Sequence, residues 1–369
     1  MADLTLEQVS DVAGLNALQE SWDEVWQASR DRSPFTTWQW ASTWWQHFGR
    51  SDRLEILVAR RAGQVVGIAP FLRARLGAGP MSHSMLVGVG QETADYGGML
   101  LGGEPEATAE LFLDRLSGEL ASGLTSVNLT RLRPDGDLQP LVERYLDDCS
   151  RRVRLVEAES DPYPYLDLGG IDDVPRLLKK LDTRNDVWRR GRRFAEHHDV
   201  EFVYDAAPDA ANLAALFDLS GRRWDTKGTR MAGLFAGEPG RAFIAEVISA
   251  MRAKDGARLS MLRADGVAVG ARLGFECGEH YLGYKECFDP AYSQFGPGQY
   301  LTSQVLHTLH ERGLDRFDFL RGEGMHKSKW ANGEQEVTYR TLHRAGRTGE
   351  VARRVMWHQM RLRLRRWTG

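Results

Sequence analysis

The sequence has few cysteines, no long apolar run and almost no net charge. Its three cysteines, Cys149, Cys277 and Cys287, are an odd number without the spacing of a metal site, so we expect reduced, packed thiols. No run approaches the roughly 18 apolar residues that a membrane-spanning helix needs. A formal net charge of -3 over 369 residues argues against nonspecific nucleic-acid binding by the whole surface.

Signatures of several other protein classes are also missing. The sequence contains no Gly-x-Ser-x-Gly elbow, no Walker-type glycine loop followed by Lys-Ser or Lys-Thr, and no Cys/His metal spacing. We therefore expect no metal. The first 15 residues have neither a basic segment nor an apolar core, so we expect no secretory signal and a cytoplasmic protein.

Two pairs of segments recur along the chain in the same order. Residues 57–71 and 261–274 both have a strand–turn–strand pattern, in which Gly63 and Gly67 match Gly266 and Gly270 at a constant offset (266 − 63 and 270 − 67 are both 203). The first glycine of each pair suits the positive φ of a hairpin turn, and the second suits a bulge or a close backbone approach. Residues 123–131 and 313–321 match at an offset of 190, and each begins with a glycine that ends a helix. The sequence therefore predicts two copies of one mixed α/β unit.

Length and composition agree with two globular domains. The chain is 42% hydrophobic and 27% charged, as in ordinary globular proteins, and it is too long for one typical core. We expect an N-terminal unit at 1–156, a C-terminal unit at 157–346 and a basic amphipathic helix at 347–369. Each unit should contain a twisted mixed sheet flanked by helices.

A candidate anion site lies in the second copy. A strand-like run at 280–284 leads through Gly296-Pro297-Gly298 into a helical pattern near Tyr300. At a helix start, unpaired backbone N–H groups and the positive end of the dipole point the same way, which favours a phosphate. An offset of 190 puts Glu106 and Thr108 at the same place in the first copy, where acidic residues repel phosphate. We therefore expect only the second copy to bind the cofactor.

Two basic segments have open interpretations. The helix expected over 174–198 has a basic face, which suits either a solvated surface or contact with an anionic ligand. Residues 351–367 mix apolar side chains with arginines. This second segment suits a packed amphipathic helix, or a surface that touches a membrane, RNA or an acidic carrier protein.

These features carry a family likeness over nearly the whole chain. The residues that carry it are the duplicated hairpin, Tyr284-Lys285 with Asp289-Pro290, Gly296-Pro297-Gly298, the run 317–323 with Lys327 and Trp330, the opening 34–40, and Asp95-Tyr96. They resemble the GNAT superfamily, and within it the CelD-like acetyltransferases of cellulose biosynthesis, which are tandem-GNAT proteins akin to FemAB and FemX. The acyl-CoA loop departs from the usual pattern at Ser293, where the family has Gln or Arg.

The resemblance implies acyl transfer from acyl-CoA to an amine of a small molecule, a peptide or a sugar. It implies that the N-terminal unit faces the acceptor and that the C-terminal unit binds the cofactor and carries catalysis. It places the cofactor at Gly296, Gly298, Gln299, Tyr300 and Lys327. The amine must lose a proton, so a carboxylate or a histidine is expected near it. Glu323 is the first choice as base, with an ion pair to Lys327 or Arg321 as the alternative, and His326 is a second choice.

Further roles follow from the same resemblance. Asp318 either orients the site or faces solvent. Tyr284 or Tyr339 either protonates the departing thiolate or packs in the sheet. Asp95 and Tyr96 suit the acceptor amine, and Arg321 and Trp330 are further candidates for substrate binding.

Two rival functions remain at this stage. The first is FemX-like transfer of an aminoacyl group from tRNA, which the basic segments favour. The second is a non-catalytic binding or scaffold role in a polysaccharide or secondary-metabolite pathway, which the irregular cofactor loop favours. The sequence leaves the acceptor, the acyl chain length and the oligomeric state open.

Overall fold

The computed structural model describes residues 3–49, 53–76, 83–148, 155–169, 171, 177, 186–225, 234–252, 256–322, 327 and 329–343. Of the features expected from the sequence, the C-terminal helix at 347–369, Glu323 and His326 lie outside these residues. Within the described part of the chain, no helix is long and apolar enough to cross a membrane.

The chain forms two compact units that are not continuous in sequence. The first unit contains the chain up to Asp161 and again from Glu336. The second unit contains Pro162 to Gln335. Both changes fall inside strands, β7 (Leu155–Asp167) and β13 (Gly333–His343), so each of these strands contributes to both units. The expected limits at 156/157 and 346/347, and the roles given to the domains, stay predictions.

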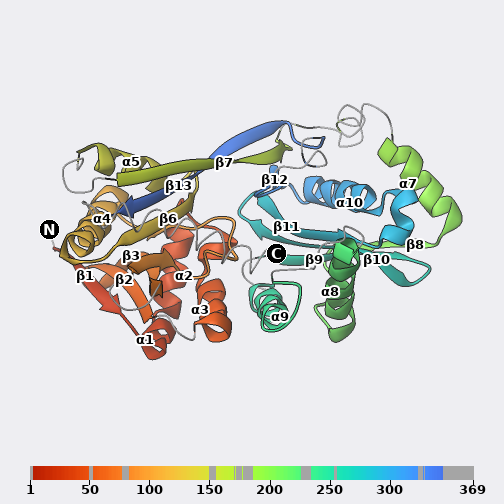
Figure 1. The fold of residues 1–369 in the computed structure, drawn as a ribbon. Helices are drawn as coiled ribbons and strands as arrows, with labels where there is room; N and C mark the ends of the chain where they lie inside the picture. Colours follow the sequence, from red (N-terminus) through yellow and green to blue (C-terminus); the bar gives the residue numbers. More distant parts are fainter. Residues whose placement is uncertain are drawn as a thin grey trace. The chain divides into compact units, whose positions relative to one another are not determined.

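The first unit begins with β1 (Leu4–Val9), followed by three helices and the 3₁₀ turn η1 (Pro34–Thr36). The helices are α1 (Val12–Ala17), α2 (Gln19–Ala28) and α3 (Trp38–Phe48). The chain continues with β2 (Arg53–Arg61), β3 (Gln64–Leu76), β4 (His83–Gly88), β5 (Leu100–Leu101), α4 (Pro105–Ser122), β6 (Ser126–Leu132) and α5 (Leu138–Asp148). The sheet order is β1-β2-β3-β4-β6-β13, with β5 on β3, and only β4 and β6 are parallel. Helices α1 to α3 lie on one face of this sheet, and α4 and α5 on the other (Figure 1).

The second unit repeats this plan. Its elements are α7 (Asp186–His197), β8 (Val200–Val203), α8 (Ala210–Asp225), α9 (Gly240–Met251), β9 (Ala257–Ala264), β10 (Val267–Cys277), β11 (His280–Phe288), the 3₁₀ turn η3 (Pro290–Phe295), α10 (Pro297–Glu311) and β12 (Arg316–Asp318). The sheet order is β8-β9-β10-β11-β12-β7, and only β11 and β12 are parallel. Helices α8 and α9 cover one face of the sheet and α10 the other (Figure 1). The same strand order in both units confirms the tandem α/β fold.

The hairpin glycines behave as the sequence predicts. Gly63 and Gly266 have φ values of 84° and 79°, which glycine adopts at little cost. Beside Gly67 and Gly270, both hairpins shift register by one residue, so each second strand contains a β-bulge. A Cβ on Gly67 would also lie 2.4 Å from Thr108, so this glycine additionally permits close packing of α4.

Each unit has its own apolar core. In the first, α4 buries Phe112 and Leu116 against strand residues such as Leu57. In the second, α10 buries Leu301 and Val305 beside Phe317. Both helices begin with proline, and the glycines expected to end them, Gly123 and Gly313, have φ values of 140° and 72°. These caps fix where the two equivalent helices begin and end.

Candidate active site

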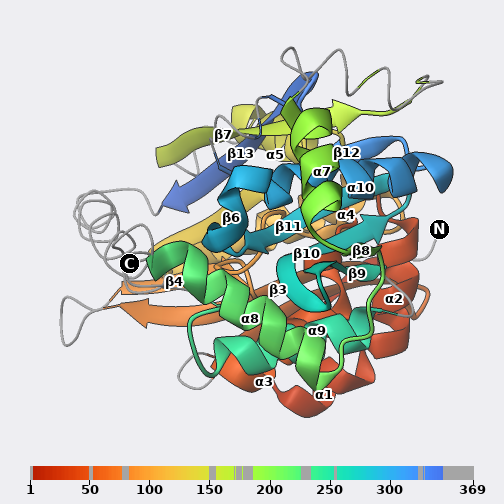
Figure 2. The same ribbon diagram turned by 90° about the vertical axis from the view of Figure 1, so that its right-hand side faces the viewer.

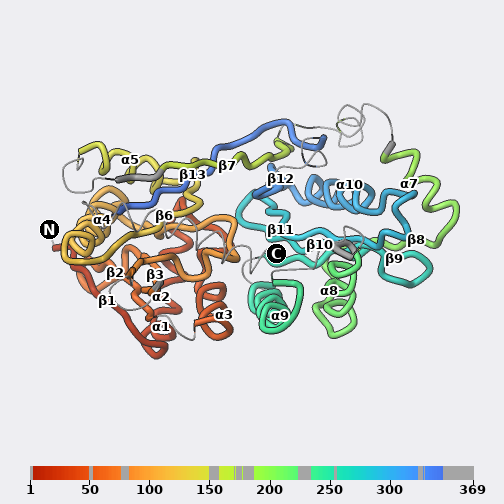
Figure 3. The backbone as a smooth tube through the Cα atoms, viewed as in Figure 1, coloured from red at the N-terminus to blue at the C-terminus, as the bar shows by residue number. Residues whose placement is uncertain are grey.

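Strands β11 and β12 separate after three residue pairs. His280, Tyr281 and Leu282 pair with residues 316–318, and β12 then ends while β11 continues to Phe288. Tyr284 is an extra residue in β11, because Lys285 pairs with Leu273 and Gly283 pairs with Gly274. We call residues 283–288 and 319–322 the β11–β12 opening. Figure 3 shows the chain passing from β11 through η3 into α10.

The start of α10 is the expected anion site. Gly296 is the N-cap, with φ 64° in the left-handed region, and the first backbone bond of the helix runs from Tyr300 N to Gly296 O at 3.0 Å. The N–H groups of Gly298 and Gln299 have no acceptor among the described residues. A Cβ on Gly298 would lie 2.9 Å from Glu286 Oε1, so the approach requires glycine. Two unpaired N–H groups at a helix start fit a phosphate.

The four α10 residues expected at the cofactor lie together at this helix start, but their side chains differ in surroundings. The Tyr300 ring packs edge-on to Phe194 of α7, with ring centres 6.1 Å apart, and burial raises the pKa of its hydroxyl. Helix α7 packs against α10 (Figure 2). Its Trp188 ring also contacts His307, with ring centres 6.3 Å apart. The Tyr300 side chain therefore contributes to the α7–α10 packing.

A buried ion pair next to the α10 start was missed by the sequence reasoning. Arg272 of β10 is 4% exposed and hydrogen-bonds to Glu286 of β11 and, at 2.6 Å, to the Thr302 hydroxyl of α10. Its guanidinium lies 5.0 Å from the centre of the Phe317 ring. The sequence signal was partial: Arg272 lies in the predicted hairpin 261–274, whereas Glu286, its partner of opposite charge, lies just beyond the strand-like run at 280–284.

Asp318 and Tyr284 lie on the sheet face that α8 and α9 cover. Asp318 is 5% exposed; its Oδ1 accepts from Leu320 N at 2.7 Å and its Oδ2 from Gln335 Nε2 at 3.2 Å. The alternative that Asp318 faces solvent is therefore wrong, because burial and two donors hold the carboxyl in place. The Tyr284 ring packs edge-on to Phe275, with ring centres 5.8 Å apart.

The ammonium group of Lys327 is hydrogen-bonded to the backbone. Its Nζ donates to the carbonyl oxygens of Phe319, Leu320 and Arg321 at 2.8, 3.2 and 2.6 Å. Arg321 itself is exposed. Trp330 is 7% exposed and belongs to the core of the second unit. The binding roles of these three residues stay predictions.

Tyr339 belongs to the first unit, because it lies on the part of β13 that pairs with β6. Its hydroxyl donates to Asp161 Oδ2 at 2.6 Å, and burial is the main reason that its pKa is raised. A raised pKa makes a hydroxyl a weaker proton donor. Its predicted role as an acid remains untested.

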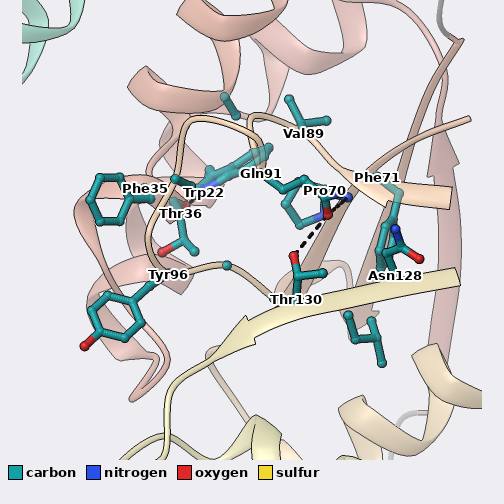
Figure 4. Close-up of a pocket in the computed structure, with 16 residues that line it drawn as sticks. Trp22, Phe35, Thr36, Pro70, Phe71, Val89, Gln91, Tyr96, Asn128 and Thr130 are labelled. Carbon is teal, nitrogen blue, oxygen red and sulfur yellow. Dashed lines mark hydrogen bonds between the residues drawn. The ribbon is translucent and has the colours of Figure 1, made fainter. Parts of the chain in front are cut away.

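The first unit has a matching opening between β4 and β6, which its own loop fills. The two strands pair only at Met85 and Leu86. Gln91 Oε1 accepts from Gly88 N at 3.0 Å and from Thr130 Oγ1 at 3.2 Å, so one side chain bridges the separated strands (Figure 4).

A small cavity of about 20 Å³, with room for about one water molecule, remains beside this loop. None of its lining side chains is charged, and its polar ones include Thr36, Gln91, Asn128 and Thr130 (Figure 4). Tyr96 also lines it and is 1% exposed, and Asp95 is 9% exposed. A lining without charge fits a neutral group better than a phosphate.

The two helix starts align differently from the sequence expectation. The offset of 190, which put Glu106 and Thr108 opposite Gly296 and Gly298, is wrong by two positions. Glu104 and Gly296 are the equivalent N-caps, both left-handed, and each precedes a proline. Glu104 forms an ion pair with Arg61 at 2.6 Å, so an acidic residue does occupy the helix start of the first unit.

Residues 182–328, about two fifths of the chain, match the family model described as an acetyltransferase (GNAT) domain. Domains of this kind generally use acyl-CoA as cosubstrate. No curated protein matches the sequence. The assignment to the CelD-like family stays a prediction.

Three solved structures resemble the chain over most of its length. FemX has 10% identity and a TM-score of 0.59, with 90% of this chain and 96% of that chain covered. The C-terminal domain of a putative lysylphosphatidylglycerol synthetase from Agrobacterium fabrum has 10% identity and a TM-score of 0.56, covering 93% and 95%. L-PGS from Bacillus licheniformis has 11% identity and a TM-score of 0.55, covering 96% and 98%. At these identities the likeness shows the fold alone. Residues 182–328 thus match a GNAT acetyltransferase domain, within a chain whose fold is like that of these three structures.

Proposed function

We propose that the chain is an N-acyltransferase that moves an acetyl or other acyl group from acyl-CoA to an amine. The observation that carries the proposal is the start of α10, where Gly298 and Gln299 present N–H groups with no acceptor among the described residues, beside Glu286 and Phe288 at the end of β11. A helix start of this kind favours anions, and a pyrophosphate is one of the groups that it binds. The GNAT match over the same residues supports this assignment.

The cofactor would be held by backbone groups of the second unit. Gly298 and Gln299 would donate to its phosphates, and Gly296 in its left-handed conformation aims the helix start. The bound thioester supplies an activated acyl group. Glu286 lies next to Gly298, and Arg272 balances its charge, so the pair leaves the helix start less negative than Glu286 alone would.

Proton transfer needs a base, and Glu323 remains our proposal. Asp318 is held by Leu320 N and Gln335, which suits a carboxylate that fixes the site. Glu286 is a weaker choice as base because Arg272 and Thr302 stabilise its ionised form. Tyr284 stays our proposal for the acid, since it is the extra residue at the point where β11 and β12 separate.

The first unit would bind the acceptor. Its cavity beside Gln91 has room for about one water molecule, so we infer that the acceptor lies outside this cavity. Asp95 and Tyr96 remain the proposed contacts of the first unit to the amine.

A second candidate is aminoacyl transfer from tRNA. Arg189, Arg192 and Arg193 of α7 are exposed, and such a basic helix face suits a phosphate backbone. The likeness to FemX and to lysylphosphatidylglycerol synthetase supports keeping this candidate. The net charge of -3 and the helix start of α10 favour the acyl-CoA proposal over it.

The test compares donors on the full chain. Acetyl-CoA at about 100 times its Kd should stabilise the protein by about 2.7 kcal/mol, and mass spectrometry should detect acetyl transfer to at least one member of an amine panel. Salt-sensitive tRNA binding without any response to acetyl-CoA would instead favour aminoacyl transfer. No response to either donor would contradict both and leave the scaffold role.

A further inference from the structure

The ammonium group of Lys327 is enclosed by the turn that follows β12. Residues 319–322 form this post-β12 turn, and three of their carbonyl oxygens accept from Lys327 Nζ at 2.6 to 3.2 Å. A Cβ built on Gly322 would lie 3.7 Å from the same nitrogen. The backbone therefore wraps around a single cation.

Among the described residues, Lys327 has as many acceptors as it has donors. A lysine ammonium has three N–H donors and no acceptor, and three carbonyl oxygens lie within hydrogen-bond distance of it. A phosphate could gain a hydrogen bond from Lys327 only if one carbonyl lost its own. The geometry therefore disfavours the direct role at the cofactor that the sequence suggested for this residue.

The post-β12 turn has a backbone shape that needs support. Leu320 has φ 56°, in the left-handed region, and Gly322 has φ 110°. A residue other than glycine in the left-handed region costs of order 1 kcal/mol, and it persists where neighbouring groups hold it. Asp318 Oδ1 holds the N–H of Leu320 at 2.7 Å, while Lys327 holds its carbonyl. A carboxylate and an ammonium thus fix the same residue from two sides.

The position of the turn connects it to the proposed reaction. It begins where β12 leaves β11, so its shape sets one wall of the β11–β12 opening. We propose that Lys327 is a positioning residue, which holds the post-β12 turn in the shape that acyl transfer requires and does not bind the cofactor phosphates. This inference rests on the proposed acyltransferase function.

The kinetic test separates positioning from phosphate binding. Lys327→Met removes the ammonium, and Lys329→Met is the matched control, because Lys329 is exposed and has no hydrogen bond among the described residues. The assay uses acetyl-CoA with the amine that the wild-type chain turns over fastest. Lys327→Met should lower kcat about tenfold or more, with the Kd for acetyl-CoA within about twofold of wild type. A rise of about tenfold in Kd with kcat unchanged would overturn the proposal, as would the same effects in Lys329→Met.

A second readout needs no activity. Hydrogen exchange of the peptide that contains residues 319–322 should become about tenfold faster in Lys327→Met and stay unchanged in Lys329→Met. Unchanged exchange in both would overturn the proposal. If wild type neither binds acetyl-CoA nor transfers acetyl, the proposed function fails, and the exchange result alone decides whether Lys327 holds the turn.

A conservative variant covers the case in which Lys327→Met does not fold. Lys327→Arg keeps the charge, but its planar fork cannot direct three donors to one point as an ammonium does. We expect the exchange rate and the kcat of Lys327→Arg to lie between those of wild type and those expected above for Lys327→Met. Full wild-type behaviour would overturn the proposal that converging donors hold the turn.

Discussion

Val66 and Val269 occupy the same extra position in two equivalent hairpins. In the first unit, Gly67 pairs with Ala59 and Val65 with Arg60, so Val66 is skipped. In the second, Gly270 pairs with Leu262 and Ala268 with Arg263, so Val269 is skipped. The separation of the two valines (269 − 66 = 203) equals that of the turn glycines, and a bulge kept at the same place supports two copies of one unit.

The turn glycines of the two units should contribute equally to the free energy of unfolding. Gly63→Ala and Gly266→Ala place Cβ in open space, but at φ values of 84° and 79°, so each should destabilise by about 1 kcal/mol through the backbone alone. Matched controls are Gly118→Ala in α4 and Gly221→Ala in α8, where open space and a helical backbone predict a gain of up to about 1 kcal/mol. Urea unfolding measures all four, and equal signs for turn and helix variants would contradict the account.

A buried carboxylate in the first unit depends on one arginine. Glu55 is 2% exposed and forms a bidentate pair with Arg73, with both oxygens 2.7 Å from the guanidinium. Arg73→Met would leave Glu55 charged and without its arginine, so we expect a loss of about 3 kcal/mol in unfolding free energy. Arg75→Met, an exposed position on the same strand, should change it by less than about 0.5 kcal/mol. Similar losses in the two variants would show that the pair has no special role.

Asp31 should make the stability of the first unit depend on pH. Burial raises the pKa of this carboxyl from 3.8 to about 7, although the N–H groups of Leu138 and Asp137 oppose the shift. A raised pKa favours the folded state while the group is protonated. The stabilisation is therefore complete below about pH 4 and is lost as the pH rises through 7, up to about 4 kcal/mol in all.

The measurement for Asp31 is urea unfolding at pH 5 and pH 8, followed by tryptophan fluorescence. Six of the eleven tryptophans lie before residue 46, so the signal reports mainly on the first unit. Asp31→Asn should flatten the pH dependence, and the exposed Asp147→Asn should leave it unchanged. A wild-type slope in Asp31→Asn would contradict the assignment.

The α10 start should tolerate no side chain at Gly298. A Cβ there would lie 2.9 Å from Glu286 Oε1 and 3.1 Å from the Phe288 ring, so Gly298→Ala must displace Glu286 or the helix start. We expect the affinity for acetyl-CoA to fall about tenfold, which corresponds to about 1.4 kcal/mol. Calorimetric titration checks this, with Gly221→Ala as the control; equal affinity in the two variants would remove the α10 start from the binding site.

The sequence predicted those parts of the fold that depend on local residues. Gly63, Gly123 and their partners in the second copy mark turns and helix ends, because only glycine adopts their backbone angles cheaply. The alignment of the two helix starts failed because the offset of 190 comes from the glycines that follow the helices, and the helices differ in length. The initial proline and that glycine are 18 positions apart in the first unit (123 − 105) and 16 in the second (313 − 297). The connections before the helices differ as well. Sixteen residues separate Gly88 from Pro105, whereas eight separate Phe288 from Pro297. The longer connection contains the loop that fills the opening in the first unit.

The rest of the site depends on contacts that local patterns do not encode. The return of β13 to β6 is a pairing over 200 residues, so no local pattern near Tyr339 indicates it. The contacts of Lys327 with the post-β12 turn require the left-handed conformation of Leu320. Leucine rarely adopts this conformation, so the sequence gives no reason to expect it there. Arg272 and Glu286 were readable only as two opposite charges, since their pairing depends on the register of β10 and β11.

The most direct test of the central claim is a hydrogen-exchange footprint of acetyl-CoA on the full chain. We expect slower exchange at residues 296–300 and 283–288 of the second unit, with no change at residues 88–98 and 104–108 of the first. Protection confined to the first unit, or absent from the α10 start at saturating acetyl-CoA, would contradict the account.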